Sequence, residues 1–160
     1  MSDVVDFSLL GFVGVVFLAA LSGAVYKPGD WYESLDRPDW RPPNWAFPIV
    51  WTLLYALIAT AGWMVWTANG GLAGAELAMA VFGVQLVLNA AWSYFFFGRR
   101  RIDWALVEAG GLWLSIAATI AVFAPHSTLA AALLVPYLAW VTVAFALNLS
   151  IYRRNPGVRG

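Results

Sequence analysis

The chain has 160 residues, of which 62% are hydrophobic and only 11% charged, and its mean hydropathy is +0.73. Soluble domains carry about a quarter charged residues, so this composition excludes a water-soluble protein and predicts an integral membrane protein. The chain has no cysteine, which excludes disulfides, thiolate catalysis and cysteine-ligated metals.

Long apolar runs predict an all-α bundle of five membrane-spanning helices. Each run has the roughly 20 residues that a bilayer crossing needs. The links between the last four spans are too short for a soluble domain, so residues 1–160 form one membrane domain. The link between the first two spans is long and rich in tryptophan and proline. The predicted spans cover residues 7–26, 46–67, 75–97, 104–124 and 129–152.

All nine lysines and arginines fall into three segments that five spans place on one side of the membrane. The positive-inside rule predicts that the first loop, the third loop and the C-terminus, which hold these residues, face the cytoplasm. The choice between an inner and an outer membrane stays open. Small basic clusters at membrane borders are typical of topology signals, so no nucleic-acid partner is expected. The three clusters are Lys27, Arg37 and Arg41; Arg99, Arg100 and Arg101; and Arg153, Arg154 and Arg159.

Aromatic and polar side chains gather in the half of the bilayer nearest the long loop. Aromatic walls with a few polar groups are typical of a small-molecule site, and flat walls favour a flat apolar ligand such as a tetrapyrrole or a sterol. Helical spacing puts these residues on inward stripes: Trp51 and Tyr55; Gln85, Asn89 and Trp92; Trp104 and Glu108; and Tyr137, Trp140, Ala144 and Asn148.

Simpler interpretations of single residues stay open. Gln85 and Asn89 can simply hydrogen-bond between helices. Glu108 can pair with an arginine of the third loop instead of facing a pocket. No His, Cys or carboxylate cluster has metal-ligand spacing, so we expect neither a metal nor a required cofactor.

The first loop runs into the second span through the sequence SLDRPDWRPPNWAFPIVW, residues 34–51. Its prolines prevent helix continuation, and each tryptophan alone can serve as a headgroup anchor. Because the loop lies above the aromatic site, we predict that it forms a lid. Deleting residues 39–44 is expected to weaken ligand binding and to leave the spans folded. The lid residues are Trp31, Trp40, Pro42, Pro43 and Trp45.

Three stretches closely resemble the tryptophan-rich sensory protein and translocator protein family (TspO/MBR, peripheral-type benzodiazepine receptor). They are WYESLDRPDWRPPNWAFPIVWTLLY, QLVLNAAWSYFFFG and PYLAWVTVAFALNLSIYRRN. The resemblance implies a five-helix bundle, often homodimeric, that binds protoporphyrin IX or related tetrapyrroles. Eukaryotic members of the family also bind sterols and synthetic benzodiazepine-site ligands, so the resemblance implies these ligand classes as well.

Carried across residue by residue, the resemblance implies that the ligand cavity includes Trp51, Asn89, Trp92, Trp104 and Trp140. It implies Trp51 and Trp140 as the catalytic pair if this chain degrades porphyrin. Together with the inward stripes, the predicted ligand-binding set is Trp51, Tyr55, Asn89, Trp92, Trp104, Glu108, Trp140, Ala144 and Asn148.

A loose sterol motif fits Leu147, Tyr152 and Arg154, although Leu149 stands where the family motif has a tyrosine.

The sequence leads to three candidate functions, given in order of preference. The first is a receptor or regulator that binds a porphyrin in the cytoplasm-facing cavity. The same cavity would also take a sterol-like ligand. The second is an enzyme that degrades porphyrin with light and oxygen and no metal. The third is a tetrapyrrole or sterol transporter, which the lack of a polar path in the far half of the bundle disfavours.

Overall fold

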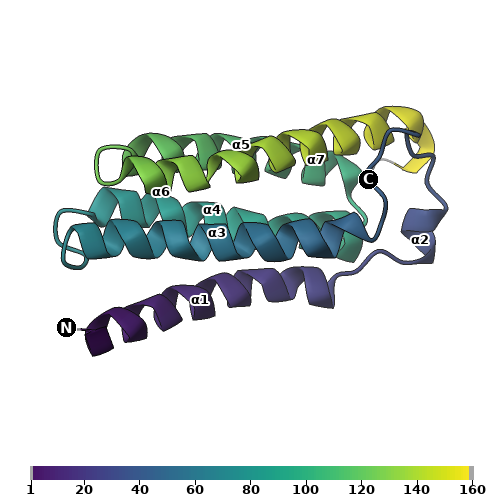
Figure 1. Ribbon diagram of the computed structural model, residues 1–160. Helices are drawn as coiled ribbons and strands as arrows, with labels where there is room; N and C mark the ends of the chain where they lie inside the picture. Colours follow the sequence, from purple (N-terminus) through teal and green to yellow (C-terminus); the bar gives the residue numbers. More distant parts are fainter. Residues whose placement is uncertain (1, 159–160) are drawn as a thin grey trace.

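The computed structural model describes residues 2–158, and the side chains of residues 7–158. Within this range five helical segments are long and apolar enough to cross a membrane, so the predicted five-span all-α fold is confirmed. The helices are α1 (Ser2–Val25), α3 (Ala46–Ala68), α4 (Glu76–Ser93), α5 (Ile102–Phe123), α6 (Thr128–Leu133) and α7 (Val135–Arg154), with the short α2 (Asp30–Glu33) in the first loop (Figure 1).

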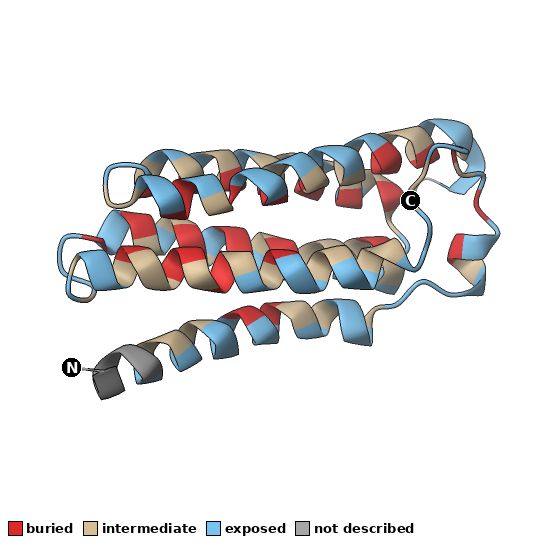
Figure 2. Cartoon of the chain, in the orientation of Figure 1, coloured by how far each residue is buried: buried red, intermediate tan, exposed pale blue. Residues whose placement is uncertain are grey.

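The spans form an up-and-down bundle in which α4 packs against α1 and α5, and α5 packs against α7. Helix α3 packs against α1 and, at the end of the bundle opposite the first loop, against α6. Buried residues lie on the sides of the helices that face their neighbours, and exposed residues lie on the outer sides (Figure 2). Many of the exposed residues are large and apolar. This arrangement suits a lipid environment, because an exposed apolar side chain has no penalty there.

A close approach of α1, α3 and α4 depends on Gly62 of α3. A Cβ atom at Gly62 would lie 2.8 Å from Cζ of Phe82 and 2.9 Å from Cδ1 of Phe12. The two phenylalanine rings, from α4 and α1, also contact each other edge to face, with centroids 5.9 Å apart. The absence of a side chain at Gly62 therefore lets three helices meet at this depth.

The last span is one helix in the prediction and two in the structure, α6 and α7. They are separated at Leu134, and Pro136 stands in the first turn of α7. Proline has no backbone N–H and its ring clashes with the carbonyl four residues earlier, so it ends a helix on its N-terminal side.

The third span ends in a π-helical turn, Tyr94–Gly98, which the hydropathy pattern does not predict. Gly98 lies against the ring of Tyr26, and a Cβ atom there would come within 2.8 Å of Cδ1 of that ring. The wider turn presents several aromatic rings together at the end of α4. Such turns occur often at functional positions.

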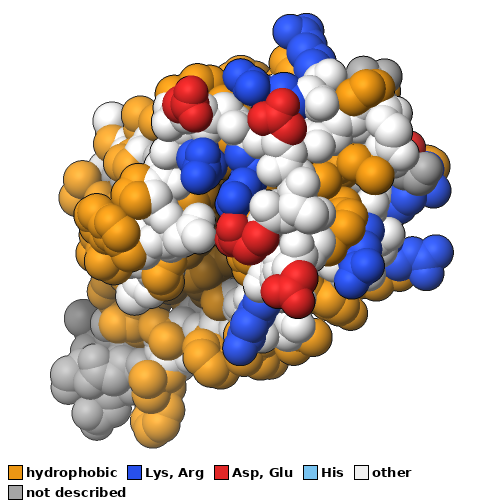
Figure 3. Space-filling model, turned by 90° about the vertical axis from the view of Figure 1, so that its right-hand side faces the viewer, with side chains coloured by type: hydrophobic (Ala, Val, Ile, Leu, Met, Phe, Trp, Pro, Cys, Tyr) orange, Lys and Arg blue, Asp and Glu red, His pale blue; other side chains and the backbone are white. Residues whose placement is uncertain are grey.

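The first loop, the third loop and the C-terminal end of α7 lie at one end of the bundle, which we call the basic end. Viewed from this end, lysine and arginine side chains alternate with aspartate and glutamate side chains (Figure 3). Arg159 lies outside the described residues, and the other eight basic residues belong to these three segments. The compartment that the basic end faces stays a prediction.

Candidate functional site

A chain of four polar side chains crosses the bundle interior from α3 through α4 to α7. The hydroxyl of Tyr55 donates to Oδ1 of Asn89 at 3.0 Å, and Nδ2 of Asn89 donates to the hydroxyl of Tyr137 at 2.9 Å. The hydroxyl of Tyr137 donates in turn to Oε1 of Gln85 at 2.9 Å. Both amides therefore bond between helices, as the simpler interpretation of the sequence held.

Tyr137 is the member of this hydrogen-bonded row of side chains to which the sequence assigned no role. Its ring is fully buried, and its hydroxyl both accepts from Asn89 and donates to Gln85. The sequence placed Tyr137 on the inward stripe of the last span. Spacing along one helix could not show that amides on another helix would meet it.

Trp51 covers this polar chain on the side of α3. Its indole stacks on the ring of Tyr55, with centroids 5.4 Å apart and planes 28° apart. It also meets Tyr137 edge to face at 6.3 Å. Trp51 is half-buried, so the stacked pair gives this part of the bundle a flat, electron-rich surface.

An open apolar groove lies between the first half of α3 and the first half of α7. Its volume is about 440 Å³, and Trp140 is its largest lining residue. The two helices run in opposite directions, so the groove crosses the middle of the bundle rather than lying directly beneath the loop. The lining residues are Val50, Leu53, Leu54, Leu57, Pro136, Ala139, Trp140 and Val143.

The indole N–H of Trp140 is buried and has no hydrogen-bond partner among the described residues. Phe47 packs edge-on against its ring, with centroids 5.5 Å apart. A buried donor without a partner carries a free-energy cost of about 1–3 kcal/mol. A ligand acceptor at this position would remove that cost.

Trp92 and Asn148 form a second group nearer the basic end. Nε1 of Trp92 donates to Oδ1 of Asn148 at 3.2 Å, and Nδ2 of Asn148 donates to the carbonyl of Ile102 at 3.2 Å. The indole of Trp92 also stacks on Phe96 of the π-helical turn at 5.1 Å. These contacts fasten α4, α5 and α7 together, so both predicted ligand residues already have partners.

Glu108 lies inside the bundle on α5 with 8% of its surface exposed. Neither carboxyl oxygen has a hydrogen-bond partner among the described residues, and Nε2 of Gln85 also has none. The alternative of an ion pair with the third loop is not observed, because Arg101 binds Asp103 instead at 2.7 Å. An acid without partners inside a membrane bundle is costly and usually marks a functional position.

Trp104 lies apart from the other predicted cavity residues. Its side chain is 53% exposed, its ring stacks on Phe95 at 6.4 Å, and the guanidinium of Arg101 lies over its ring at 5.9 Å. The structure therefore does not bring Trp104 together with Trp51 and Trp140. Ala144, by contrast, lies half-buried on α7, one turn beyond Trp140.

The first part of the loop, with α2, packs on a second hydrophobic cluster at the basic end. Tyr32 and Leu35 are buried in this cluster, which includes Phe96 and Ile151. Trp31 packs against the same cluster and meets Phe96 edge to face at 5.9 Å. This anchored part therefore packs onto the basic end of the bundle, since the other buried residues of the cluster belong to α5, α7 and the π-helical turn.

The second part of the loop is exposed. Trp40 and Trp45 project outward, with Trp45 69% exposed, while Pro42 is half-buried and Pro43 exposed. A polar hollow of about 420 Å³ opens beside this part at the basic end. The lid prediction stays a prediction, since only Trp31 of its tryptophans packs onto the body of the protein. The lining residues of the hollow are Glu33, Arg37, Asp39, Arg41, Pro43, Asn44 and Trp45.

Arg37 and Glu33 form the charged wall of this hollow, with Nη2 of Arg37 2.8 Å from Oε2 of Glu33. Burial alone would lower the pKa of the Arg37 guanidinium, but the hydrogen bond to Glu33 and the charge of that carboxylate together raise the pKa above its ordinary value. The guanidinium also lies over the ring of Tyr32 at 4.9 Å. The guanidinium therefore stays ionised, and its bond to Glu33 ties the hollow to α2.

The predicted sterol motif faces the protein rather than the lipid. Leu147 is buried in the second cluster and Tyr152 packs against it. Arg154 is paired with Asp36 of the first loop at 3.5 Å. Among residues 7–158, whose side chains the structure describes, no three metal-ligating side chains lie close enough to hold an ion. The donor and ring chemistry of the site is thus that of indoles, phenols, amides and one carboxyl.

Fold and site together define a five-span α-helical membrane protein with an aromatic, amide-bearing interior. Residues 9–153 match the model of the TspO/MBR family, and the chain belongs to this family. It is 42% identical over 143 residues to protein CrtK of Rhodobacter capsulatus, covering 87% of each chain. It is 40% identical to the tryptophan-rich sensory protein of Cereibacter sphaeroides, covering 91% of this chain and 90% of that one. It is 37% identical to the human translocator protein, covering 94% of this chain and 92% of the relative.

Proposed function

We propose that this protein is a membrane receptor or regulator that binds a porphyrin, protoporphyrin IX or a close relative, along the groove between α3 and α7. The observation that carries the proposal is the apolar groove of about 440 Å³ with Trp140 in its wall, a residue whose buried indole N–H has no partner among the described residues. The volume falls within the roughly 300–1,000 Å³ of small-molecule sites. The sensory role is supported by the name of the Cereibacter sphaeroides relative.

The chemistry of the groove suits a flat, mostly apolar ligand with a few acceptor atoms. Aliphatic side chains of α3 and α7 offer contact to the faces of a macrocycle, and the indole of Trp140 offers one hydrogen bond. The stacked rings of Trp51 and Tyr55 belong to the same helix, α3, where they are sequence neighbours of the lining residues Val50 and Leu54. A sterol or a synthetic aromatic ligand meets the same demands of shape.

Two further properties belong to the proposal. The basic end faces the cytoplasm, because the described lysines and arginines are collected there. The working unit is a homodimer in the membrane, as the family resemblance implies. Neither property is needed for the groove to bind its ligand.

Porphyrin binding is tested with protein in lipid nanodiscs by titrating protoporphyrin IX and following the shift of the porphyrin absorption band. We expect saturable binding that weakens about two- to tenfold in Trp51→Phe and Trp140→Phe, since aromatic contacts contribute about 0.5–1.5 kcal/mol each. Trp66→Phe is the matched control, because Trp66 lies in the last turns of α3 at the far end. Absence of saturation, or an equal loss in Trp66→Phe, contradicts the proposal.

A second candidate function, light-dependent porphyrin degradation, is favoured by the same indoles. A bound porphyrin can act as sensitiser, with molecular oxygen reduced as the macrocycle is oxidised and no metal required. Illuminated protein under oxygen should yield a new absorbing product, and darkness or Trp51→Phe should prevent its formation. If porphyrin bleaches at the same rate in empty nanodiscs, the enzymatic alternative fails and the receptor stands.

A further inference from the structure

A hollow lined by charges of both signs lies at the basic end, where the first loop leads into α3. Its volume is about 420 Å³, within the roughly 300–1,000 Å³ of small-molecule sites. Two acidic and two basic residues line it, so the formal charges of its walls cancel. None of them lines the groove between α3 and α7. The four charged residues are Glu33, Arg37, Asp39 and Arg41.

Only half of these charges are paired within the protein. Arg37 and Glu33 form an ion pair at 2.8 Å through Oε2 of the glutamate, and Oε1 of Glu33 takes no part in it. The carboxylate of the exposed Asp39 makes no hydrogen bond or ion pair with the residues that the structure describes. A charge in the wall of a hollow that has no protein partner is available to a ligand.

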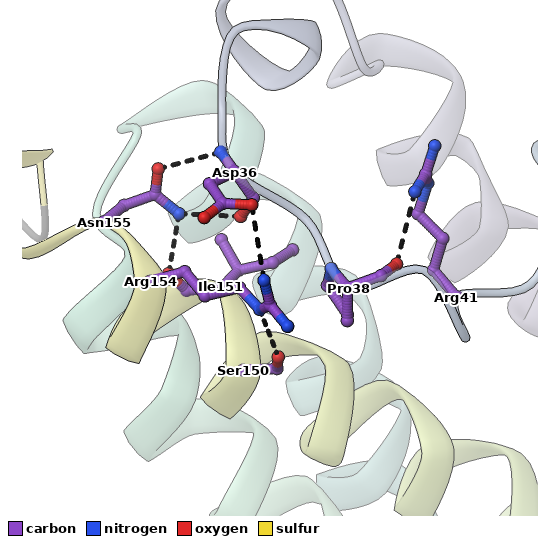
Figure 4. Close-up of polar contacts among 7 residues, drawn as sticks. All are labelled: Asp36, Pro38, Arg41, Ser150, Ile151, Arg154 and Asn155. Carbon is purple, nitrogen blue, oxygen red and sulfur yellow. Dashed lines mark hydrogen bonds and ion pairs between the residues drawn. The ribbon is translucent and has the colours of Figure 1, made fainter.

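Arg41 is the second unpaired charge. Nη1 of its guanidinium donates to the carbonyl of Pro38 at 3.2 Å, and no acidic side chain in the described part of the chain lies within ion-pair distance. Figure 4 shows this guanidinium apart from the contacts that Asp36 makes with the end of α7. Its remaining N–H groups can bind an acceptor from outside the protein, and the guanidinium fork matches the oxygens of a phosphate.

The backbone around the hollow is held in place. The N–H of Asp36 donates to Oδ1 of Asn155 at 2.9 Å, and Nδ2 of Asn155 donates to the carbonyl of Asp36 at 2.9 Å (Figure 4). Pro38 is buried, and the rings of Pro42 and Pro43 fix their φ angles. Less conformational freedom is lost when a ligand binds to such a wall, which favours binding.

The hollow lies at the depth of the lipid headgroups. Asn44 and Trp45 line it and directly precede the membrane span Ala46–Ala68. A span begins where the hydrocarbon core of the bilayer ends, so the hollow lies beside the headgroup layer. Trp40 and Trp45 are 55% and 69% exposed, and tryptophan is enriched in this layer. Lipids of the leaflet at the basic end can therefore reach the hollow.

The start of α3 adds a place for negative charge to the same wall. No described side chain caps this helix, and the free N–H groups at the start of a helix carry a partial positive charge that favours an anion. Together with the guanidinium of Arg41 they offer a place for a phosphate. The carboxylate of Asp39 and Oε1 of Glu33 offer acceptors to an ammonium group.

We propose that this hollow binds the headgroup of a phospholipid that carries both a phosphate and a primary ammonium, namely phosphatidylethanolamine. An anionic headgroup such as that of phosphatidylglycerol would face the two carboxylates with no positive group of its own. A choline headgroup has no N–H to donate to them. The proposal does not depend on porphyrin binding, because it concerns only the first loop and the surrounding leaflet.

The test is native mass spectrometry of the delipidated protein in detergent, with equal amounts of phosphatidylethanolamine, phosphatidylcholine and phosphatidylglycerol of identical acyl chains. We expect the ethanolamine lipid to bind about three- to tenfold more than either other lipid, and Arg41→Gln to lower its binding by a similar factor, since charge-assisted hydrogen bonds are lost. Asp39→Asn should remove the preference over the choline lipid. This variant breaks no contact within the protein, because the carboxylate has no partner among the described residues.

Lys27→Gln is the matched control. Lys27 is an exposed cation of the same loop without an ion partner among the described residues, and it does not line the hollow. Its replacement should change the binding of each lipid less than about twofold. Equal binding of the three lipids by the parent, or equal losses in Lys27→Gln and Arg41→Gln, would overturn the proposal.

Soluble phosphoethanolamine distinguishes a lipid site from a site for a soluble compound. It carries the same phosphate and ammonium but has no acyl chains. In large molar excess it should leave the bound lipid in place, because the lipid also has apolar contacts beside the exposed tryptophans. Displacement of the lipid by phosphoethanolamine would show that the hollow takes a soluble compound, and would overturn its assignment to a lipid.

Discussion

At the scale of single residues, the decisive feature is the row of four hydrogen-bonded polar side chains in the interior of the bundle, where no bulk water can replace a lost partner. Tyr55, Asn89, Tyr137 and Gln85 satisfy one another across three helices. In the interior of a membrane protein an unpaired polar group has no solvent to turn to. The chain therefore fixes the relative rotation of α3, α4 and α7, and with it the position of the groove.

Removing the central hydroxyl tests this. Tyr137→Phe leaves Nδ2 of Asn89 and Oε1 of Gln85 without their partner at a fully buried position. We expect the free energy of unfolding to fall by about 1 kcal/mol, near the upper range for hydrogen bonds between membrane helices. The measurement is unfolding in mixed micelles with rising dodecyl sulfate.

Tyr55→Phe is the matched control for that prediction. Its hydroxyl makes one bond, at the end of the chain, and the residue is only half-buried. The loss should be smaller than for Tyr137→Phe. Equal losses, or a more stable Tyr137→Phe protein, would show that the polar chain does not organise the helices.

The sequence predicts which faces carry the site but not which residues meet. Helical spacing correctly predicts that Asn89 faces inward. It does not show which residues bind its amide, because those partners lie on other helices. It put Trp104 and Glu108 on one stripe, whereas Glu108 is buried and Trp104 exposed. Positions four apart differ by about 40° around a helix, which is enough to separate inside from outside at the edge of a stripe.

At the scale of elements, hydropathy predicts the spans well and their irregularities poorly. The break before Pro136 follows from a proline that the sequence displays, and it could have been predicted. The π-helical turn Tyr94–Gly98 could not, since its Gly98 packs against Tyr26, which directly follows α1 and is distant in the sequence. Close approaches between helices are set by tertiary packing, which a hydropathy profile does not contain.

A substitution at Gly62 tests the contact of α3 with α1 and α4. In Gly62→Ala the new methyl group must displace the rings of Phe12 and Phe82, which lie under 3 Å from its position. We expect α1 to loosen from α3 and α4 and the free energy of unfolding to fall by about 1–3 kcal/mol.

Gly83→Ala on α4 is the control, because nothing lies within 4 Å of its added Cβ atom. Alanine favours the helix over glycine, so this variant should be as stable as the parent or slightly more stable. Unfolding in mixed micelles compares the two. A Gly62→Ala protein as stable as Gly83→Ala would mean that the phenylalanine rings yield without cost.

At the scale of the whole molecule, the two ends of the bundle differ in charge. The basic end collects the described arginines and Lys27, while the α3–α4 and α5–α6 links at the other end carry no lysine or arginine. The one histidine, His126, lies in the α5–α6 link with Nδ1 3.1 Å from Oδ1 of Asn69 in the α3–α4 link. Such asymmetry orients a protein during insertion, because basic loops are retained on the cytoplasmic side.

The absence of native cysteine makes this orientation directly measurable. Gly29→Cys places a thiol in the first loop and Ala73→Cys places one in the α3–α4 link, and both positions are exposed. Neither change alters a basic residue, and an added Cβ atom at Gly29 has open space around it. In spheroplasts of a bacterium expressing the protein in its inner membrane, a membrane-impermeant maleimide should label Ala73→Cys and spare Gly29→Cys. In permeabilised cells both variants should be labelled and the parent should stay unlabelled. The reverse pattern in intact spheroplasts would put the basic end and the first loop outside the cell.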